Sequence, residues 1–208
     1  MEVICDKLSK NFGFQRIVRE VDIVFEKQSV TGIGGRNGSG KSTLLKMISG
    51  YLSPSSGSVT YLIKNETVIR NDVFQYLCFS APYIELTPSF SLQETFEHYS
   101  SFKPTQDISY NSFVDFCELP DTKNKQLSVF SSGMKQKINL ALALISDVPL
   151  LIFDEPTSYL DDEAKKWFYN SLQHNLNGKT VIIASNDSDD FGLVTKRYKV
   201  EQGRLEHS

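Results

Sequence analysis

Gly35-Arg36-Asn37-Gly38-Ser39-Gly40-Lys41-Ser42 is the stretch that decides the fold. It matches G-x-x-x-x-G-K-[ST] at every fixed position, after an apolar run at residues 30–33 and before a helix expected over 41–49. Glycines let the backbone curl so that successive N–H groups bind phosphate oxygens, and the helix start adds partial positive charge. A glycine-rich turn with a chance lysine is the alternative, which this context disfavours. We therefore predict a phosphate site in which Lys41 reaches the β- and γ-phosphates and Ser42 ligates Mg²⁺.

A second stretch ends in two carboxylates. Leu150-Leu151-Ile152-Phe153 is apolar and runs directly into Asp154 and Glu155. Ligands of open α/β sheets bind at the carboxyl ends of the strands. The pair alone reads equally well as a solvated strand exit, but the phosphate loop upstream favours a catalytic role. We expect Asp154 to hold Mg²⁺, through water, and Glu155 to polarise a water for attack on the γ-phosphate.

The remaining chain predicts an α/β protein with an insertion. Alternation predicts half-exposed strands near the N-terminus, and unbroken apolar runs predict strands buried on both faces of a parallel sheet. These strands are expected at 21–26, 58–62 and 67–69, and at 149–153 and 180–184. Helices are expected after a capping box at Ser91 and Glu94, over 132–145, and from the acids at 161–163 to Asn177-Gly178.

The insertion runs roughly from residue 82 to 128, and with the following helix it defines a predicted helical sub-domain at 82–145 within one domain of 1–208. It is rich in aromatic residues, which suits either the small core of that sub-domain or an exposed surface for a partner. Both interpretations can hold together. The aromatic residues are Tyr83, Phe90, Phe96, Tyr99, Phe102, Tyr110, Phe113 and Phe116.

Composition excludes several classes of protein. The 208 residues carry a net charge of −3, which gives no overall basic footprint, so no nucleic acid is expected as a partner. Three distant cysteines form neither a disulfide framework nor a metal motif, which favours a reducing, cytoplasmic location. No apolar run approaches the roughly 20 residues of a membrane-spanning helix.

Beyond these two general nucleotide motifs, the chain resembles the ATP-binding cassette (ABC) ATPases over nearly its whole length. Residues 130–134, Phe-Ser-Ser-Gly-Met, resemble the family signature LSGGQ, with Ser131 and Gly133 kept and the leucine, first glycine and glutamine replaced. Residues 157–161, Thr-Ser-Tyr-Leu-Asp, resemble the D-loop. Phe12 resembles the aromatic residue that stacks on adenine, with an ordinary core aromatic as the alternative.

The resemblance implies a P-loop fold of the ABC type, with a mixed sheet core, an antiparallel N-terminal β part and the inserted helical sub-domain. It implies ATP and Mg²⁺ as cofactors, and head-to-tail pairing of two ATPase subunits, as homodimer or heterodimer, upon ATP binding. The signature of one subunit then meets the γ-phosphate held by the other. The implied nucleotide contacts are Phe12, Gly35, Arg36, Asn37, Gly38, Ser39, Gly40, Lys41, Ser42, Thr43, Ser131 and Gly133.

Two departures from the family pattern affect the chemistry. No glutamine lies near residues 79–83, where the family places one that helps bind Mg²⁺, so Ser80 or a water is expected in its place. Asn186 stands where a histidine is usual. An asparagine side chain can hydrogen-bond the γ-phosphate or the attacking water but carries no charge. We therefore expect hydrolysis to be slower than with the usual histidine, and its pH dependence to show no imidazole titration. Glu155, Lys41 and Asn186 are the predicted catalytic residues.

The resemblance favours the ATPase subunit of a membrane transporter, located peripherally on the cytoplasmic face of the cell membrane. Separate transmembrane permease subunits would dock near residues 79–83 and the aromatic-rich insertion. One alternative is a soluble ABC ATPase acting on DNA or ribosomes. Another is a weakly hydrolysing module that uses ATP to hold a dimer together. Glu155, the proposed base, favours turnover over the second alternative.

Overall fold

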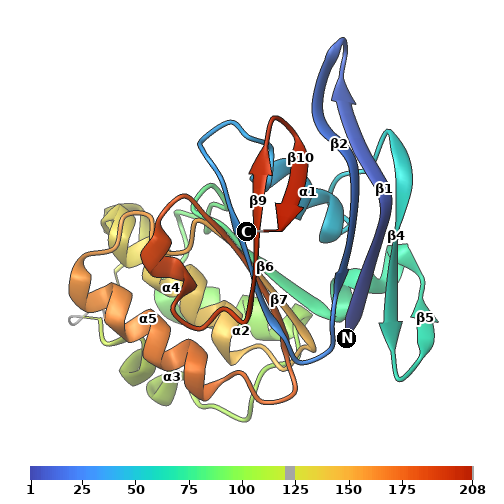
Figure 1. The fold of residues 1–208 in the computed structure, drawn as a ribbon. Coiled ribbons are helices and arrows are strands. Elements are labelled where there is room, and N and C mark those ends of the chain that lie inside the picture. The colour runs from blue at the N-terminus through green and yellow to red at the C-terminus, as the bar shows by residue number, and fades with distance from the viewer. Residues whose placement is uncertain (120–124, 208) are drawn as a thin grey trace.

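The computed structural model describes residues 1–119 and 125–207, which build two sheets, with one helix between them and the other helices on the far side of the larger sheet (Figure 1). The larger sheet has the order β10-β9-β3-β8-β7-β6, and only β10 runs antiparallel to its neighbour. In that order its strands are Arg204–His207, Lys196–Glu201, Val30–Gly34, Thr180–Ser185, Leu150–Asp154 and Leu77–Ser80.

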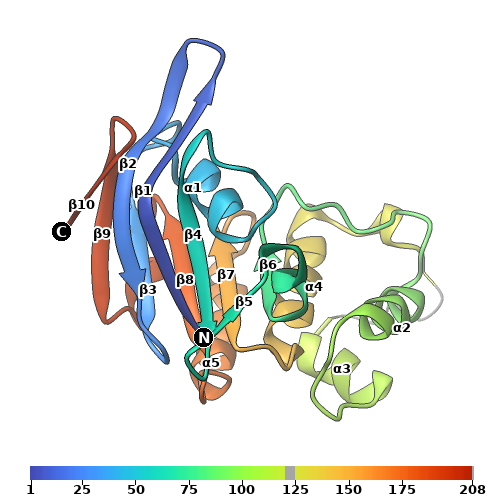
Figure 2. The same cartoon turned by 90° about the vertical axis from the view of Figure 1, so that its right-hand side faces the viewer.

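The smaller sheet is antiparallel, with the order β2-β1-β4-β5. Its strands in that order are Gln15–Phe25, Glu2–Phe12, Ser56–Ile63 and Glu66–Val68. Helix α1 (Lys41–Ile48) lies between the two sheets, where Leu44, Leu45 and Ile48 are fully buried (Figure 2). One face of the larger sheet is thus closed by α1 and the smaller sheet.

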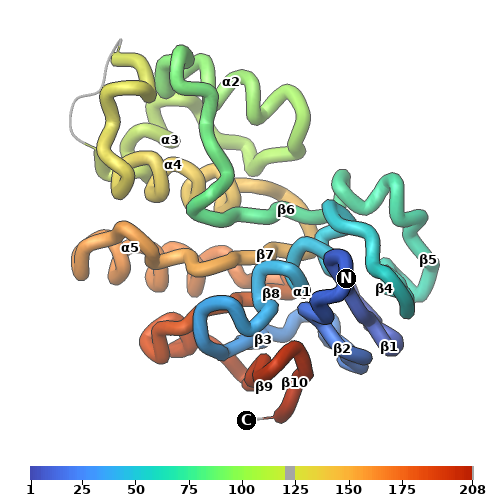
Figure 3. Tube along the Cα trace, turned by 90° about the horizontal axis from the view of Figure 1, so that it is seen from above, coloured from blue at the N-terminus to red at the C-terminus, as the bar shows by residue number. Residues whose placement is uncertain are grey.

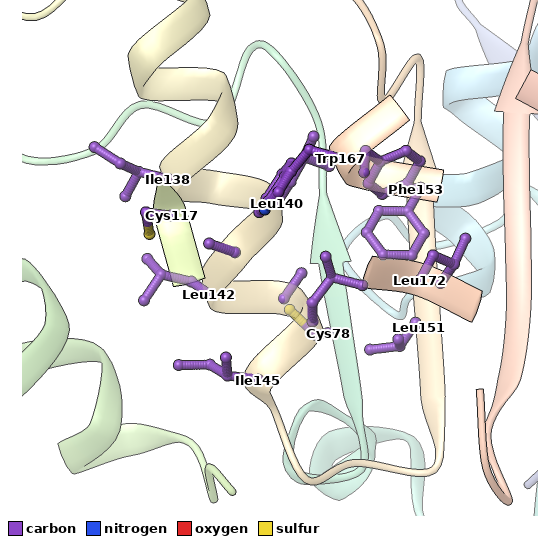
Figure 4. Close-up of a cluster of buried hydrophobic side chains, with 14 of the residues drawn as sticks. Cys78, Cys117, Ile138, Leu140, Leu142, Ile145, Leu151, Phe153, Trp167 and Leu172 are labelled. Carbon is purple, nitrogen blue, oxygen red and sulfur yellow. The ribbon is translucent and has the colours of Figure 1, made fainter. Parts of the chain in front are cut away.

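The other helices pack on the opposite face and beyond the β6 edge of the larger sheet. Figures 2 and 3 show α2 (Leu92–Phe102), α3 (Tyr110–Cys117) and α4 (Ser132–Ile145) as a lobe beside β6. Helix α5 (Asp162–His174) lies along the sheet, and its residues Trp167 and Leu172 join α4 and β7 in one core (Figure 4). Short 3₁₀ helices η1, η2 and η3 cover Arg70–Gln75, Leu127–Val129 and Ser188–Phe191.

These elements confirm the predicted fold class. Every residue of β7 and β8 is buried, as expected of apolar strands covered on both faces. Helix α4 has the predicted bounds, and the box at Ser91 caps α2. The predicted end of α5 at Asn177-Gly178 is wrong. The helix ends at His174 because Asn175 caps it, donating from its backbone N–H to Leu172 and from its side chain to Ser171.

The aromatic residues after β6 divide between a core and a surface. Phe96 and Phe113 are buried and stacked, with ring centroids 4.9 Å apart, whereas Tyr83 and Phe102 are exposed. The sub-domain at 82–145 stays a prediction, and residues 120–124 of it lie outside the described residues. His98, His174 and His207 are exposed, as expected. None of the helices in the described ranges combines the length and the apolar composition that a membrane span needs.

Candidate nucleotide-binding site

The glycine-rich loop joins β3 to α1, and its backbone requires glycine at two positions. Gly35 has a φ of 149°, and Gly40, which precedes the first turn of α1, has a φ of 110°. A Cβ on Gly35 would lie 2.6 Å from the Val200 carbonyl oxygen, and one on Gly40 would lie 2.8 Å from that of Ile17. The loop is therefore pressed closely against β9 and β2.

Lys41, the first residue of α1, is 4% exposed and points back into the loop. Its ammonium donates to the Gly35 carbonyl oxygen at 2.7 Å and lies 3.2 Å from Glu155 Oε1. Glu155 follows the end of β7, and its positive φ of 47° turns the chain sharply there. The predicted phosphate-binding lysine and the predicted base are thus direct partners.

The end of β8 supplies further contacts to Glu155. Its Oε2 accepts from the Ser185 hydroxyl at 3.3 Å and from the Asn186 backbone N–H at 3.2 Å. The Asn186 side-chain amide donates to Asn37 Oδ1 at 2.9 Å. Asn186 therefore lies between the glycine-rich loop and Glu155, at the position from which it could reach a γ-phosphate.

Asp154, the last residue of β7, is fully buried. Its Oδ2 accepts a hydrogen bond from the Tyr83 hydroxyl at 2.8 Å, and its Oδ1 has no hydrogen-bond partner among the described residues. Burial raises the pKa of this carboxyl, and the hydroxyls of Ser42 and Tyr83 and the Lys41 ammonium oppose the shift. A carboxylate beside a serine hydroxyl fits Mg²⁺, which takes few protein ligands and completes its shell with water and phosphate oxygens.

Other predicted contacts lie around the same loop. Phe12 ends β1 with its ring half exposed, 5.2 Å from the Lys10 ammonium, so it is a free aromatic face and no core residue. Thr43 lies in the first turn of α1, and Arg36 is exposed on the loop. The Ser39 hydroxyl is buried and has no hydrogen-bond partner within the described residues.

The signature residues lie at the start of α4, away from this loop. Ser131 caps the helix, and its Oγ accepts from the Met134 backbone N–H at 3.2 Å. A Cβ on Gly133 would lie 2.8 Å from the carbonyl oxygen of Tyr159, which belongs to the predicted D-loop. Ser131, Gly133, Tyr159 and Asp161 share a cavity of about 570 Å³ that no residue of the glycine-rich loop lines.

The structure thus separates the predicted site residues into two groups. The loop residues 35–43 meet Asp154, Glu155 and Asn186, while Ser131 and Gly133 face their own cavity. Within residues 1–119 and 125–207, no hydrogen bond or ion pair joins the two groups. In a single chain the loop group and the signature group are therefore separate.

Sequence reasoning missed Tyr83 as a member of this site. Ser80 was expected near the cation, but its Oγ is buried in β6 without a hydrogen-bond partner among the described residues, while Tyr83 reaches Asp154. The parallel pairing of β6 with β7 carries the signal, because both strands end at the same edge of the sheet. A residue shortly after β6 is therefore placed to meet Asp154.

Known proteins share this arrangement of sequence and structure. The family model described as ABC transporter matches residues 18–158. The Bacillus subtilis protein called uncharacterized ABC transporter ATP-binding protein YybJ is 30% identical, over 97% of this chain and 93% of its own length. Nod factor export ATP-binding protein I of Rhizobium etli is 29% identical, and the match covers 94% of this chain and 64% of that protein.

Solved structures agree with the fold. The dimeric structure of MJ0796, a bacterial ABC transporter cassette, has a TM-score of 0.85 at 22% identity and covers 99% of this chain and 97% of its own. The post-hydrolysis dimer of MJ0796 bound to ADP and Pi has a TM-score of 0.84 at 22% identity and covers 99% and 98%. With the motifs in place and the family model matching most of the chain, the protein belongs to the ABC transporter family, as an ATP-binding and ATP-hydrolysing subunit.

Proposed function

We propose that the chain hydrolyses ATP with Mg²⁺ between two head-to-tail copies and so drives separate transmembrane permease subunits. The observation that carries the proposal is the contact between Lys41 and Glu155, because it puts an anion-binding lysine and a carboxylate base at one point. Lys41 is nearly buried and its ammonium lies 3.2 Å from the Glu155 carboxylate. A γ-phosphate entering the loop would replace this carboxylate as the partner of Lys41.

The released Glu155 would then accept a proton from the attacking water. Its other oxygen already accepts from the Ser185 hydroxyl and the Asn186 N–H, and these bonds would keep the carboxylate at the end of β7. Asn186 would turn its amide from Asn37 toward the γ-phosphate. Bound Mg²⁺, held by Ser42 and through water by Asp154, would supply positive charge that stabilises the transferring phosphoryl group.

Pairing of two copies explains why the signature cavity is distant from the loop. Ser131 and the N-terminus of α4 form a second anion-binding point, favoured by the helix dipole. In a two-fold arrangement each chain offers both faces, so two composite sites form at once. ATP would stabilise the closed pair because it contacts both copies, and hydrolysis would remove the bridge.

A cleft at the junction of the sheet and the helical lobe is the proposed permease site. Its volume is about 550 Å³, and it is lined by the C-terminal end of α1, by η1, by β6 and by α2. Tyr51 and Phe74 at its rim are exposed, and Phe79 and Tyr83 link it to Asp154. An apolar permease segment fits this surface, and its binding would hold the chain on the cytoplasmic face of the membrane.

Phosphate release tests the catalytic part of the proposal. Wild type is compared with Glu155→Gln, which keeps the size of the side chain but removes the base. We expect wild type to turn over ATP and the variant to bind ATP while releasing phosphate at least about a hundredfold more slowly, the lower end of the range for a general base. Equal release by both proteins would show that Glu155 is not the base.

Binding to permease subunits tests the second part. Phe74→Glu places a charge in the cleft, whereas Ile69→Glu changes an equally exposed apolar residue that does not line it. We expect only Phe74→Glu to abolish co-purification with membranes that carry the permease, with ATP affinity unchanged. Loss of co-purification in both variants, or in neither, would contradict docking in the cleft.

A further inference from the structure

Tyr83 connects three parts of the molecule through one side chain. It lies on the segment after β6, and its ring packs against Phe79 with centroids 6.4 Å apart at an interplanar angle of 60°. The ammonium of Lys46, on α1, lies 4.2 Å from the centre of the ring. The hydroxyl donates to Asp154 Oδ2 at 2.8 Å, at the end of β7. Although the side chain is 45% exposed, both its ring and its hydroxyl have specific partners.

In the Asp154 carboxylate, one oxygen accepts a hydrogen bond and the other does not. Oδ2 is held by the phenol, whereas Oδ1 is buried and has no hydrogen-bond partner in the described part of the chain. An unpaired buried carboxylate oxygen costs free energy unless a cation or donor completes it. Asp154 is also fully inaccessible to solvent, so its orientation depends on its few contacts.

Tyr83 is well suited to fix that orientation. A phenol has one hydrogen to donate, and tyrosine has only two side-chain torsions, so the contacts with Phe79 and Lys46 restrict where the hydroxyl points. Groups that hydrogen-bond a ligating carboxylate typically alter metal affinity by 10- to 100-fold when they are removed. The buried Ser80 hydroxyl makes no hydrogen bond within the described residues, so it does not duplicate this contact.

We propose that Tyr83 is a positioning residue for the divalent cation: its hydroxyl holds Asp154 Oδ2 so that Oδ1 remains for the cation and its waters. The proposal rests on the proposed Mg²⁺ site at Ser42 and Asp154. Removing only the hydroxyl should weaken the coupling between Mg²⁺ and nucleotide without weakening nucleotide binding itself.

Calorimetric titration of the full chain with ADP, in Mg²⁺ and in EDTA, measures this coupling without turnover. The dissociation constant of ADP in EDTA divided by that in Mg²⁺ reports the contribution of the cation. We expect Tyr83→Phe to reduce that ratio about tenfold, with the affinity in EDTA unchanged. Tyr51→Phe removes a phenol hydroxyl from an exposed residue of the same cleft and should keep the wild-type ratio.

A double-mutant cycle tests whether Tyr83 acts through Asp154. In an Asp154→Asn background, Tyr83→Phe should cause no further loss of coupling between Mg²⁺ and nucleotide. The reason is that Tyr83 is proposed to act only through the Asp154 carboxylate, which the background has already removed. An additional tenfold loss there would overturn the proposal. So would a wild-type ratio in Tyr83→Phe alone. If wild type itself shows no effect of Mg²⁺, the cation site fails and the role of Tyr83 fails with it. An altered affinity in EDTA would assign the residue to the nucleotide site instead.

Discussion

Lys41 and Glu155 form an ion pair, and this contact has a consequence for the binding of ATP. Both groups are largely shielded from water, at 5% and 21% side-chain exposure. Charges in such surroundings need a partner at all times, since an unpaired buried charge is strongly destabilising. We expect ATP to enter by exchange, in which its γ-phosphate replaces the Glu155 carboxylate at Lys41 while Glu155 keeps its hydrogen bonds to Ser185 and Asn186.

With Asn186 at this position, we expect the rate of hydrolysis to show no imidazole titration. The three histidines are exposed, and within the described residues none of them hydrogen-bonds to Glu155 or Asn186. We expect kcat to be flat from about pH 6 to 8 and to fall on the order of a hundredfold in Asn186→Ala, the loss typical of one polar donor. Asn186→His should introduce a new step near pH ~6.5.

The measurement is the steady-state rate against pH for the three proteins. His98→Ala serves as a control, because that side chain is exposed on α2 and far along the chain from the site. A wild-type step near pH ~6.5 that disappears in Asn186→Ala would refute the role assigned to this asparagine.

The cysteines should be inert while the chain is folded. Cys5, Cys78 and Cys117 are all buried, and burial raises the pKa of Cys5 and of Cys117 to about 12. These pKa values lie above the value of about 8.5 for a thiol in the unfolded chain. Burial of the protonated thiols therefore contributes fully to the free energy of unfolding below pH ~8.5, and this contribution declines as the pH rises toward 12. A disulfide reagent at pH ~8 should label no thiol in the native chain and three in guanidinium. Rapid native labelling would contradict this burial.

At the scale of elements, the start of α2 depends on a local capping motif. Ser91 Oγ accepts from the Glu94 N–H at 3.2 Å, and Glu94 Oε2 accepts from the Ser91 N–H at 2.7 Å. Ser91→Ala should lower the free energy of unfolding by about 1 kcal/mol, because one backbone donor of the helix loses its partner. Urea unfolding measures this loss.

Ser101→Ala is the matched control for this cap. Ser101 is exposed in the last turn of α2, where its hydroxyl bonds only to the His98 carbonyl. We expect it to change stability by no more than about 0.5 kcal/mol. If both serine variants lose the same stability, the box at Ser91 makes no special contribution.

Elements determined by residues adjacent in sequence were predicted better than contacts between residues far apart in sequence. The loop at 35–42, the buried strands β7 and β8 and the cap at Ser91 follow from residues adjacent in sequence, and all lie where expected. The end of α5 was misplaced because Asn175 competed with the later Asn177-Gly178. Tyr83 could not be assigned because its contact with Asp154 spans 71 residues and depends on strand pairing.

At the scale of the whole molecule, the glycine-rich loop, the signature cavity and the cleft occupy three different regions of the surface. The glycine-rich loop closes against the antiparallel sheet, the signature cavity opens at α4 and the D-loop, and the cleft lies between α1, η1 and α2. The loop 81–91 joins β6 to α2 and carries Tyr83. A partner bound in the cleft would contact Phe79, whose ring packs against Tyr83. The order of strands around β3 required the structure, since sequence patterns do not encode non-local neighbours.

Sedimentation of Glu155→Gln with and without ATP and Mg²⁺ tests the central claim most directly, because blocked hydrolysis should accumulate the closed pair. We predict a monomer without nucleotide and a dimer holding two ATP molecules with it. Adding Gly133→Ala should leave ATP bound to a monomer, since the new methyl group would displace the start of α4 from Tyr159. A Glu155→Gln chain that binds ATP as a monomer, or a dimer that forms equally well with Gly133→Ala, would contradict the account.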